Sequence, residues 1–229
     1  MKKIIVIPAY NEEGNLEKTV RDIRENAPDF DYVIVNDCST DNTLGMCREK
    51  GFSYLNLPVN LGIGGAVQTG YRYAYYHGYD LAVQFDGDGQ HSAKFLAQMA
   101  QVLEETESDM VIGSRFIEKE GFQSSGLRRI GIRYFSLLIK LLTGKTVTDP
   151  TSGMRMINRK LLKKFTNEYP KDYPEPESVV TLLKKGKKVK EIPVTMNARE
   201  EGVSSISPVK AVYYMVKVSI AILIAAVRK

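Results

Sequence analysis

Short apolar runs alternate with amphipathic stretches through the first half of the chain. Apolar runs of about five residues that end in polar or glycine-rich segments are typical of buried strands. Longer stretches, with apolar positions three and four residues apart, are typical of helices that pack on a sheet. The pattern predicts strands at 3–7, 32–36, 54–57, 81–85 and 110–113, and helices at 15–26, 40–50, 64–78 and 93–105.

This alternation predicts an α/β fold in which helices cover both faces of a mostly parallel sheet. Sheets of this kind bind their ligands beyond the carboxyl ends of the strands. Polar or acidic segments directly follow four of the predicted strands, so we expect the binding site at that edge. These segments are PAYNEE, DCSTDN, DGDGQH and SRF.

The pattern changes after residue 117, where loops, two longer helices and short strands are expected. No segment has the composition of a linker, so we expect one catalytic domain over residues 1–206 and a C-terminal helix within 207–229. Residues 169–178, YPKDYPEPES, are rich in proline and acid and favour an exposed loop. The other predicted pieces are a loop at 118–126, a helix at 127–144, a loop and short strand within 148–160, a strand at 187–196 and a helix from 208.

Composition and charge narrow the class of protein only moderately. Of the 229 residues, 43% are apolar and 26% are charged, and the net charge is +5, as in ordinary globular proteins. Cys38 and Cys47 are the two cysteines, which excludes a disulfide framework and a four-cysteine zinc site and favours a reduced compartment. The first apolar run ends at Pro8 without a cleavage pattern, so a first strand is expected and not a signal peptide.

The segment QFDGDGQH places two carboxylates, Asp86 and Asp88, two positions apart after a buried strand. Gly87 and Gly89 let the backbone bend so that both carboxylates reach one ion. Hard oxygen ligands suit Mg²⁺ or Mn²⁺, with phosphate oxygens completing the shell. The alternative is a solvated acidic turn, because Asp-Gly is common in turns.

Two further segments predict contacts to a nucleotide. Asp37 is not needed as a helix cap, a role that Thr40 or Asp41 can fill, so a contact to a base or ribose is plausible. The glycines that open the predicted helix at 64–78, Gly62, Gly64 and Gly65, do not form a dinucleotide fingerprint, because its third glycine would fall at Val67. The amides around Gly64 still suit phosphate or sugar oxygens, and simple close packing is the alternative.

Six motifs stand in the order found in family 2 glycosyltransferases. The chain resembles most the branch of dolichyl-phosphate mannose synthases and bacterial polyprenyl-phosphate glycosyltransferases, from residue 3 to about residue 206. The resemblance implies a GT-A fold, a nucleotide-sugar donor and a divalent cation, Mg²⁺ or Mn²⁺. The motifs are IPAYNEE, VNDCSTDNT, NLGIGGAVQTGY, QFDGDGQH, GSRF and DPTSGMRM.

The resemblance also implies roles for individual residues. The second loop departs from the usual Asp-Asp-Gly-Ser, because Asn36 precedes Asp37 here, so only Asp37 is expected to recognise the base. The implied nucleoside-binding residues are Pro8, Tyr10, Glu12 and Asp37, the metal ligands are Asp86, Asp88 and Gln90, the residue near sugar and acceptor is Arg115, and the residues that close on the diphosphate are Arg199 and Ser205.

A phosphate acceptor is already an anion at neutral pH, so it needs positioning and charge neutralisation more than a general base. Asp149 is the acid expected nearest the acceptor, where it orients the acceptor or acts as a base; a turn before Pro150 is the alternative. Glu175 and Glu177 are weaker candidates, and His91 is expected behind the metal ligands.

The C-terminal segment is apolar but too short to span a bilayer. Its uninterrupted part, residues 218–227, is ten residues long, which is about 15 Å as a helix, against roughly 30 Å of hydrocarbon. We expect a helix in the membrane interface or against a partner, with an ordinary packing helix as the alternative. Basic residues at 128, 129, 133, 140 and 184–190 are expected to face anionic lipid.

The expected function is the inverting, metal-dependent transfer of a hexose to a polyprenyl phosphate such as undecaprenyl phosphate. UDP-glucose or UDP-N-acetylglucosamine is the expected donor, the product would serve cell-surface glycan synthesis, and the enzyme would sit peripherally on the cytoplasmic face of the membrane. Members of the resembled branch often carry transmembrane helices after this point, so a small membrane protein or self-association is expected to supply anchoring. No nucleic-acid partner is expected. Two alternatives are a soluble transferase acting on a glycan hydroxyl and a non-catalytic nucleotide-sugar-binding subunit.

Overall fold

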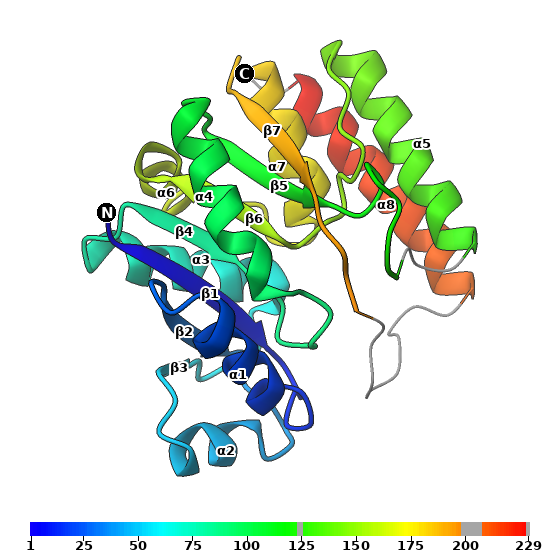
Figure 1. Cartoon of the computed structure of the whole chain (residues 1–229). Helices are drawn as coiled ribbons and strands as arrows, with labels where there is room; N and C mark the ends of the chain where they lie inside the picture. The colour runs from blue at the N-terminus through cyan, green and yellow to red at the C-terminus, as the bar shows by residue number, and fades with distance from the viewer. Residues whose placement is uncertain (123–125, 198–207, 228–229) are drawn as a thin grey trace.

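A computed structural model describes residues 1–122, 126–197 and 208–227 (Figure 1). In this part of the chain, seven strands form one sheet in the order β3-β2-β1-β4-β6-β5-β7. β6 runs antiparallel to both of its neighbours, and the other pairs are parallel. The predicted α/β class with a mostly parallel sheet is therefore confirmed. The strands are β1 (Lys3–Ala9), β2 (Asp31–Asn36), β3 (Tyr54–Asn56), β4 (Leu81–Gln84), β5 (Met110–Ser114), β6 (Arg155–Asn158) and β7 (Val189–Pro193).

Helices cover both faces of this sheet, because its strands are apolar on both sides. In β1, Ile4 and Val6 pack into the core on one face, and Ile5 and Ile7 pack into the core on the other. The first core contains side chains of α3, α5, α6, α7 and α8, and the second contains side chains of α1, α2 and α4. The helices are α1 (Leu16–Asn26), α2 (Thr43–Glu49), α3 (Gly62–Tyr76), α4 (Leu96–Glu105), α5 (Gly126–Thr143), α6 (Arg159–Phe165), α7 (Pro174–Lys184) and α8 (Pro208–Val227), and a 3₁₀ turn, η1 (Ala93–Phe95), precedes α4.

The expectation of an exposed loop over 169–178 is wrong in its second half, because α7 begins at Pro174. Proline is well tolerated in the first turn of a helix, where its missing N–H would have no partner within the helix. Glu175 and Glu177 lie in the same turn, where negative charge is favoured by the helix dipole. The proline and acid content that indicated a loop is therefore that of a helix start.

The antiparallel strand β6 shapes the edge of the sheet that was expected to hold the site. β1, β2, β4 and β5 all end at this edge, and β6 begins there, with Arg155 opposite Gln84 in the register. The loop before β6, residues 149–153, consequently reaches the same edge as the segment after β4. Polar segments that are far apart in the sequence are thus brought together.

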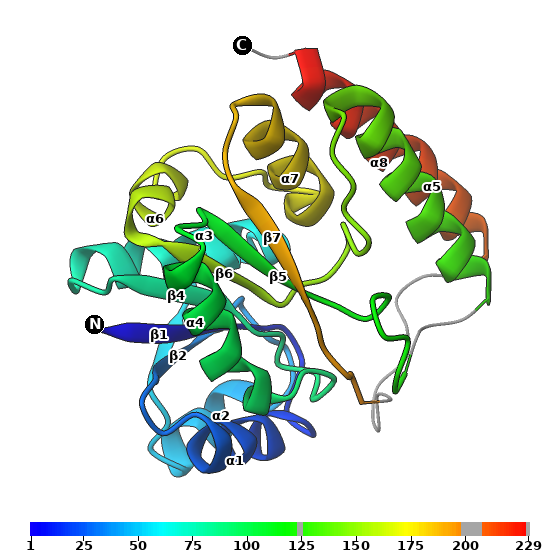
Figure 2. The ribbon, with the colours of Figure 1, turned by 45° about the horizontal axis from the view of Figure 1, so that its top comes forward.

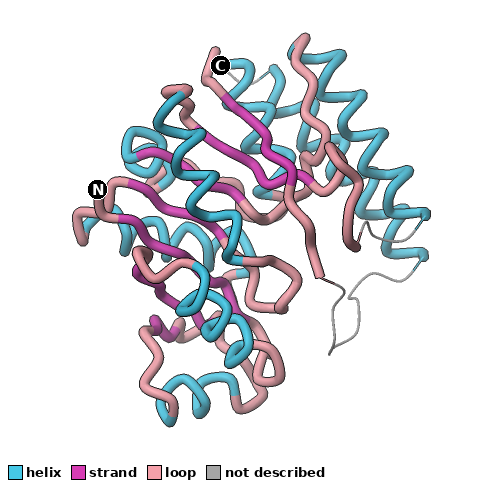
Figure 3. Tube along the Cα trace, viewed as in Figure 1, coloured by secondary structure: helices cyan, strands magenta, loops and turns pink. Residues whose placement is uncertain are grey.

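Three helices stand beyond the β5–β7 side of the sheet. α7 packs against β7 and against α8, and α8 lies beside α5 (Figure 2). α5 and α8 run in the same direction, and each begins on the side of the molecule where β5 and β7 end (Figures 1 and 2). Figure 3, in the same view as Figure 1, shows these two helices in cyan at the outside of the molecule. None of the described helices combines the length and the apolar character needed to cross a membrane.

Candidate functional site

A cavity of about 410 Å³ lies at the carboxyl edge of the sheet. It opens between the ends of β1 and β2, the start of α3 and the segment after β4. Most of the residues predicted from the nucleotide and metal motifs line it. The lining consists of Pro8, Ala9, Tyr10, Glu12, Asp37, Asn60, Gly62, Ile63, Ala66, Asp86, Gly87 and Asp88.

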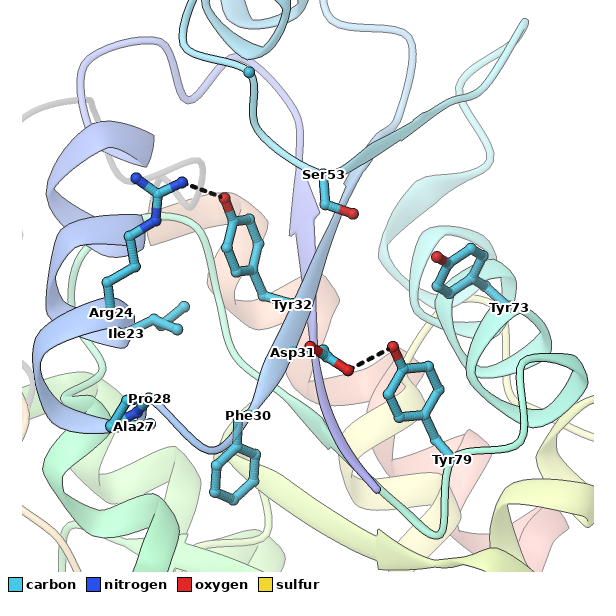
Figure 4. A pocket seen from close by; sticks show the side chains of 11 residues that line it. Ile23, Arg24, Ala27, Pro28, Phe30, Asp31, Tyr32, Ser53, Tyr73 and Tyr79 are labelled. Carbon is cyan, nitrogen blue, oxygen red and sulfur yellow. Dashed lines mark hydrogen bonds between the residues drawn. The ribbon is translucent and has the colours of Figure 1, made fainter. Parts of the chain in front are cut away.

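A second cavity, of about 550 Å³, lies at the opposite end of the strands, between the end of α1 and the start of β2 (Figure 4). Its polar side chains bond to one another: the Tyr79 hydroxyl donates to Asp31 Oδ2 (2.9 Å), and Arg24 donates to the Tyr32 hydroxyl (3.1 Å). None of the predicted site residues lines this cavity. The candidate functional site is therefore the cavity at the carboxyl edge.

The loops after β1 and β2 are tied together into one wall of the site. The Asn11 amide donates to Ser39 Oγ (3.0 Å), and the Glu12 amide donates to Thr43 Oγ1 (3.0 Å). Asn11 has a φ of 58°, a conformation that asparagine tolerates better than most residues. This wall presents Pro8 and Tyr10 to the cavity.

Asp37 is buried and joins three segments at the floor of the cavity. Its amide donates to the Ala9 carbonyl (2.9 Å), and its Oδ1 accepts from the Leu61 amide (2.7 Å). Asp41 instead accepts from the Thr43 amide at the start of α2. Burial alone would raise the pKa of Asp41, but the hydrogen bonds from Thr43 and Glu13 lower it overall. Asp41 therefore supports the helix start, and Asp37 faces the cavity.

The segment after β4 that carries Asp86 and Asp88 is held by local hydrogen bonds. The Asp86 amide donates to Nδ1 of the buried His91 (3.0 Å), which places the ring behind the motif, and Nε2 of His91 lies 3.6 Å from Asp86 Oδ2. Asp88 Oδ1 accepts from the Gln90 amide (3.1 Å). A Cβ on Gly153 would come within 2.4 Å of Asp86 Oδ2, so a larger residue in the loop before β6 would displace this carboxylate.

Asp86 and Asp88 are the type of ligand that Mg²⁺ and Mn²⁺ prefer, and both line the cavity. No cluster of three or more His, Cys, Asp or Glu side chains suited to a metal occurs among residues 1–122, 126–197 and 208–227. Phosphate oxygens and water are the usual further ligands of a Mg²⁺ ion that carboxylates hold. Gln90 does not line the cavity, and its amide nitrogen lies 3.5 Å from the Asn197 carbonyl.

Arg115 and Asp149 form a bidentate ion pair at the same edge. Arg115 Nε lies 2.6 Å from Asp149 Oδ2, and Nη2 lies 2.8 Å from Oδ1. The Asp149 side chain is fully buried, whereas part of Arg115 remains accessible. Two parallel bonds fix the plane of the guanidinium, so the aspartate orients the arginine.

A buried polar network behind Asp86 escaped the sequence analysis. Gln84 Nε2 lies between two carboxylates, 3.2 Å from Asp86 Oδ1 and 3.4 Å from Glu175 Oε1. The fully buried Arg155 donates to the carbonyls of Pro150, Ser152 and Glu175. Arg155 thus joins the loop before β6 to the start of α7. The signal available in the sequence was an arginine between two methionines at the start of a short strand, since a buried arginine requires partners.

Glu175, expected in an exposed loop, instead lies in this network. Burial raises the pKa of its carboxyl group; Arg155 opposes this rise, and Asp86 adds to it. Glu175 is not exposed because it lies in the first turn of α7, which faces Gln84 of β4.

Gly64 lies where α3 meets the backbone of residues 170–171. A Cβ there would lie 2.2 Å from the Lys171 carbonyl oxygen and 2.3 Å from that of Pro170. Gly62 and Ile63 line the cavity, and Gly64 does not. Its position fits the close-packing alternative. Arg199 and Ser205, expected near the diphosphate, lie outside the described residues.

Known proteins resemble this chain in both sequence and fold. The family described as Glycosyl transferase family 2 matches residues 4–166. The UDP-N-acetylglucosamine–dolichyl-phosphate N-acetylglucosaminyltransferase of Methanococcus voltae is 30% identical over 210 residues, covering 83% of each chain. The undecaprenyl-phosphate mannosyltransferase of Micrococcus luteus is 28% identical over 216 residues, covering 90% of this chain and 88% of that protein.

One solved structure resembles the fold of this chain over almost its whole length. Glucosyl-3-phosphoglycerate synthase from Mycobacterium tuberculosis, in complex with Mn²⁺, uridine diphosphate and glucosyl-3-phosphoglycerate, superposes with a TM-score of 0.73 at 18% identity. The superposition covers 98% of this chain and 79% of that one, which confirms the expected GT-A architecture. Because the family match spans residues 4–166, most of the sequence described here, the chain belongs to glycosyl transferase family 2 and is a glycosyltransferase.

Proposed function

We propose that the protein transfers a hexose from a nucleotide sugar to a polyprenyl phosphate. Relatives from Methanococcus voltae and Micrococcus luteus carry names that describe sugar transfer to dolichyl and undecaprenyl phosphate. The observation that carries the proposal is the convergence of Asp86, Asp88 and the Arg115–Asp149 pair at one edge of the sheet. This arrangement supplies both a seat for a cation and an oriented positive charge.

The donor is assigned to the cavity lined by the loops after β1 and β2. The base and ribose lie between Tyr10 and Asp37, and the diphosphate points toward Asp86 and Asp88. Asp86 and Asp88 would hold Mg²⁺ or Mn²⁺, which would neutralise the negative charge on the departing nucleoside diphosphate. We assign the donor as UDP-glucose or UDP-N-acetylglucosamine.

The acceptor phosphate is assigned to Arg115. The guanidinium neutralises the phosphate and aims it at the anomeric carbon, while Asp149 keeps the guanidinium in plane. Both Asp149 oxygens bond to Arg115, which favours a positioning role for this acid over a role as base. A phosphate oxygen attacks directly, because it needs no deprotonation at neutral pH. Single displacement inverts the anomeric centre, so an α-linked donor gives a β-linked lipid phosphate.

The acceptor chemistry places the enzyme peripherally at a membrane surface, and we assign it to the cytoplasmic face, where nucleotide sugars would reach it. A small membrane protein or a second copy of the chain would be further partners there. The names of the relatives support the lipid-linked acceptor, and these assignments rest on that acceptor.

The test is a panel of nucleotide sugars incubated with undecaprenyl phosphate and Mg²⁺ or Mn²⁺, with products identified by mass and their linkage by NMR. One donor should give a β-linked lipid phosphate sugar. Asp88→Ala should reduce transfer by about 10³-fold or more, because the charge on the leaving diphosphate is no longer neutralised. Asp29→Ala, at an exposed turn far from the site, is the matched control.

Three outcomes would contradict the proposal. Transfer only to free glycans would point to a hydroxyl acceptor, and an α-linked product would exclude a single displacement. Donor binding without transfer to either acceptor would indicate a nucleotide-sugar-binding subunit.

A further inference from the structure

The outer sides of α5 and α8 are apolar, although each helix already buries an apolar face inside the protein. Ile132, Phe135 and Ile139 of α5 are buried, as are Val218, Ile222 and Ala225 of α8. We call the exposed apolar residues on the other side the α5–α8 face. It consists of Ile130, Tyr134, Leu137 and Leu141 on α5, and Tyr213, Val216, Ile220, Leu223, Ile224 and Val227 on α8.

The spacing of these residues gathers them into one stripe on each helix. On α5 the stripe steps from residue 130 by four, three and four positions, and α8 follows the same kind of spacing. Residues three and four apart lie on one side of a helix. A helix on a soluble surface normally turns a polar side outward, so a second apolar stripe marks a surface that contacts something apolar.

The two stripes form one continuous surface because the two helices contact each other and lie side by side. A Cβ on Gly131 would lie 2.9 Å from Met215 Sδ, so α8 packs directly on the α5 backbone there. The hydroxyls of Tyr134 and Ser219 are 3.1 Å apart. Figures 1 and 2 show the helices side by side, on the outside of the molecule beyond α7.

Basic residues border this surface on both outer edges. Gly131 and Met215 face each other, and Arg133 and Lys217 each follow two positions later, which turns them about 160° away from the contact. Arg129 and Lys140 share the outer edge of α5 with Arg133, since they are spaced by four and seven positions. Neither helix contains an Asp or a Glu.

We propose that the α5–α8 face docks onto an anionic lipid bilayer, with both helices lying in the plane of the interface. Aliphatic side chains would enter the boundary of the acyl chains, while the flanking Arg and Lys contact lipid phosphates. Tyr134 and Tyr213 suit the same depth, because tyrosine favours the membrane–water boundary. A second copy of the chain fits less well, since a twofold pairing would bring the same cations together.

Docking by this face would set the catalytic edge beside the membrane. α5 and α8 begin on the side where β5 and β7 end, and the Asn197 amide, just beyond β7, donates to the Gln90 carbonyl (2.8 Å) in the metal motif. A lipid-borne phosphate could then reach Arg115 without leaving the bilayer. This last consequence rests on the proposed function, whereas the docking itself does not.

Vesicle flotation without substrate tests the docking. The protein should float with vesicles of phosphatidylcholine and phosphatidylglycerol in equal parts, and less with phosphatidylcholine alone. The double change Leu137→Asp and Ile220→Asp should weaken binding by about tenfold or more, because a charge enters each apolar stripe. Tyr76→Asp, which is 76% exposed on α3, is the matched control and should float as the unchanged protein does.

A second variant tests lipid binding without placing aspartates in the apolar stripes, where they could disturb folding. Arg133→Gln with Lys140→Gln alters only exposed cations and should weaken binding to the mixed vesicles by about threefold to tenfold, with little effect on phosphatidylcholine vesicles. Absence of flotation with mixed vesicles, or equal flotation of both variants and the unchanged protein, would overturn the proposal. A dimer in light scattering that Leu137→Asp dissociates would assign the face to a second copy instead.

An assay of transfer without vesicles distinguishes failure of the docking from failure of the proposed function. With a short-chain, water-soluble polyprenyl phosphate and no vesicles, the Leu137→Asp, Ile220→Asp variant should retain transfer, because the catalytic edge is unchanged. Absence of transfer by the unchanged protein in that assay would count against the function alone. Normal transfer together with absence of flotation would count against the docking alone.

Discussion

At the scale of single residues, the site depends on polar groups that are fixed by other polar groups. Arg115 is oriented by Asp149, the amide of Asp86 by His91, and the loop before β6 by Arg155. Each of these partners is buried. A change at a partner should therefore alter catalysis through position, and not through loss of a reacting group.

Asp149→Asn tests this reasoning directly. The change keeps the shape of the side chain but removes the charge that pairs with the guanidinium, so Arg115 should lose its fixed plane. We expect kcat/KM for the acceptor to fall by about 10²-fold, with the KM for the nucleotide sugar nearly unchanged. Steady-state kinetics with each substrate varied in turn would show this.

The pH profile separates a positioning role from a catalytic base. If Asp149 only positions Arg115, the variant should keep the pH dependence of the unchanged enzyme at a lower rate. Loss of the acidic limb of the profile would instead identify Asp149 as the base.

Glu175 gives a prediction for stability against pH. Burial raises the pKa of its carboxyl group above the ordinary 4.5, so the folded state holds this proton more tightly than the unfolded state. The stability that this proton provides is complete below pH 4.5 and is lost as pH rises through the folded-state pKa. Glu175→Gln, which cannot ionise, should melt higher than the unchanged protein at neutral pH, by about 2–4 °C per kcal/mol regained.

Thermal melts of both proteins across acidic and neutral pH would check this. The gap in melting temperature should shrink as pH falls toward 4.5. A gap that stays constant, or that widens toward acid, would mean that the Glu175 carboxylate is stabilised in the fold, contrary to its burial.

At the scale of elements, the starts of helices carry much of the site. α3 begins at the cavity and packs on the backbone of residues 170–171, and α7 begins beside Gln84 and Asp86. Both starts were hard to place from the sequence. The glycines in the first turn of α3 suggested phosphate binding, and the prolines at the start of α7 suggested a loop.

Gly64→Ala distinguishes packing from ligand binding at the start of α3. A Cβ there would overlap two backbone carbonyls, so we expect a loss of about 1–3 kcal/mol in the free energy of unfolding. Gly126→Ala, at the start of α5 with no atom within 4 Å of its added Cβ, is the control and should be neutral or stabilising. Denaturant melts of both variants measure the difference.

Donor titrations complete this comparison. Reduced stability with unchanged donor affinity would support packing as the reason for the glycine. Unchanged stability with weaker donor binding would instead show that Gly64 serves the ligand.

At the scale of the whole molecule, the order of the strands in the sheet determines which loops meet at the site. The sequence predicted five parallel strands and the edge to which they point, because local periodicity reports which residues are buried. It did not predict that β6 enters between β4 and β5 in the opposite direction. That insertion brings the loop of residues 149–153 against Asp86, which no local pattern encodes.

The sequence by itself determined the α/β class, the acidic pair Asp86 and Asp88, Asp37 as the acid at the cavity, and a C-terminal helix with an apolar face. These follow from spacing along the chain, which backbone geometry converts into faces and edges. Only the tertiary structure decided that Asp149 pairs with Arg115, that Glu175 and Arg155 lie behind Asp86, and that α5 joins α8 in one apolar surface. Each of these depends on residues distant in sequence, whose contact is fixed by the packing of the whole core.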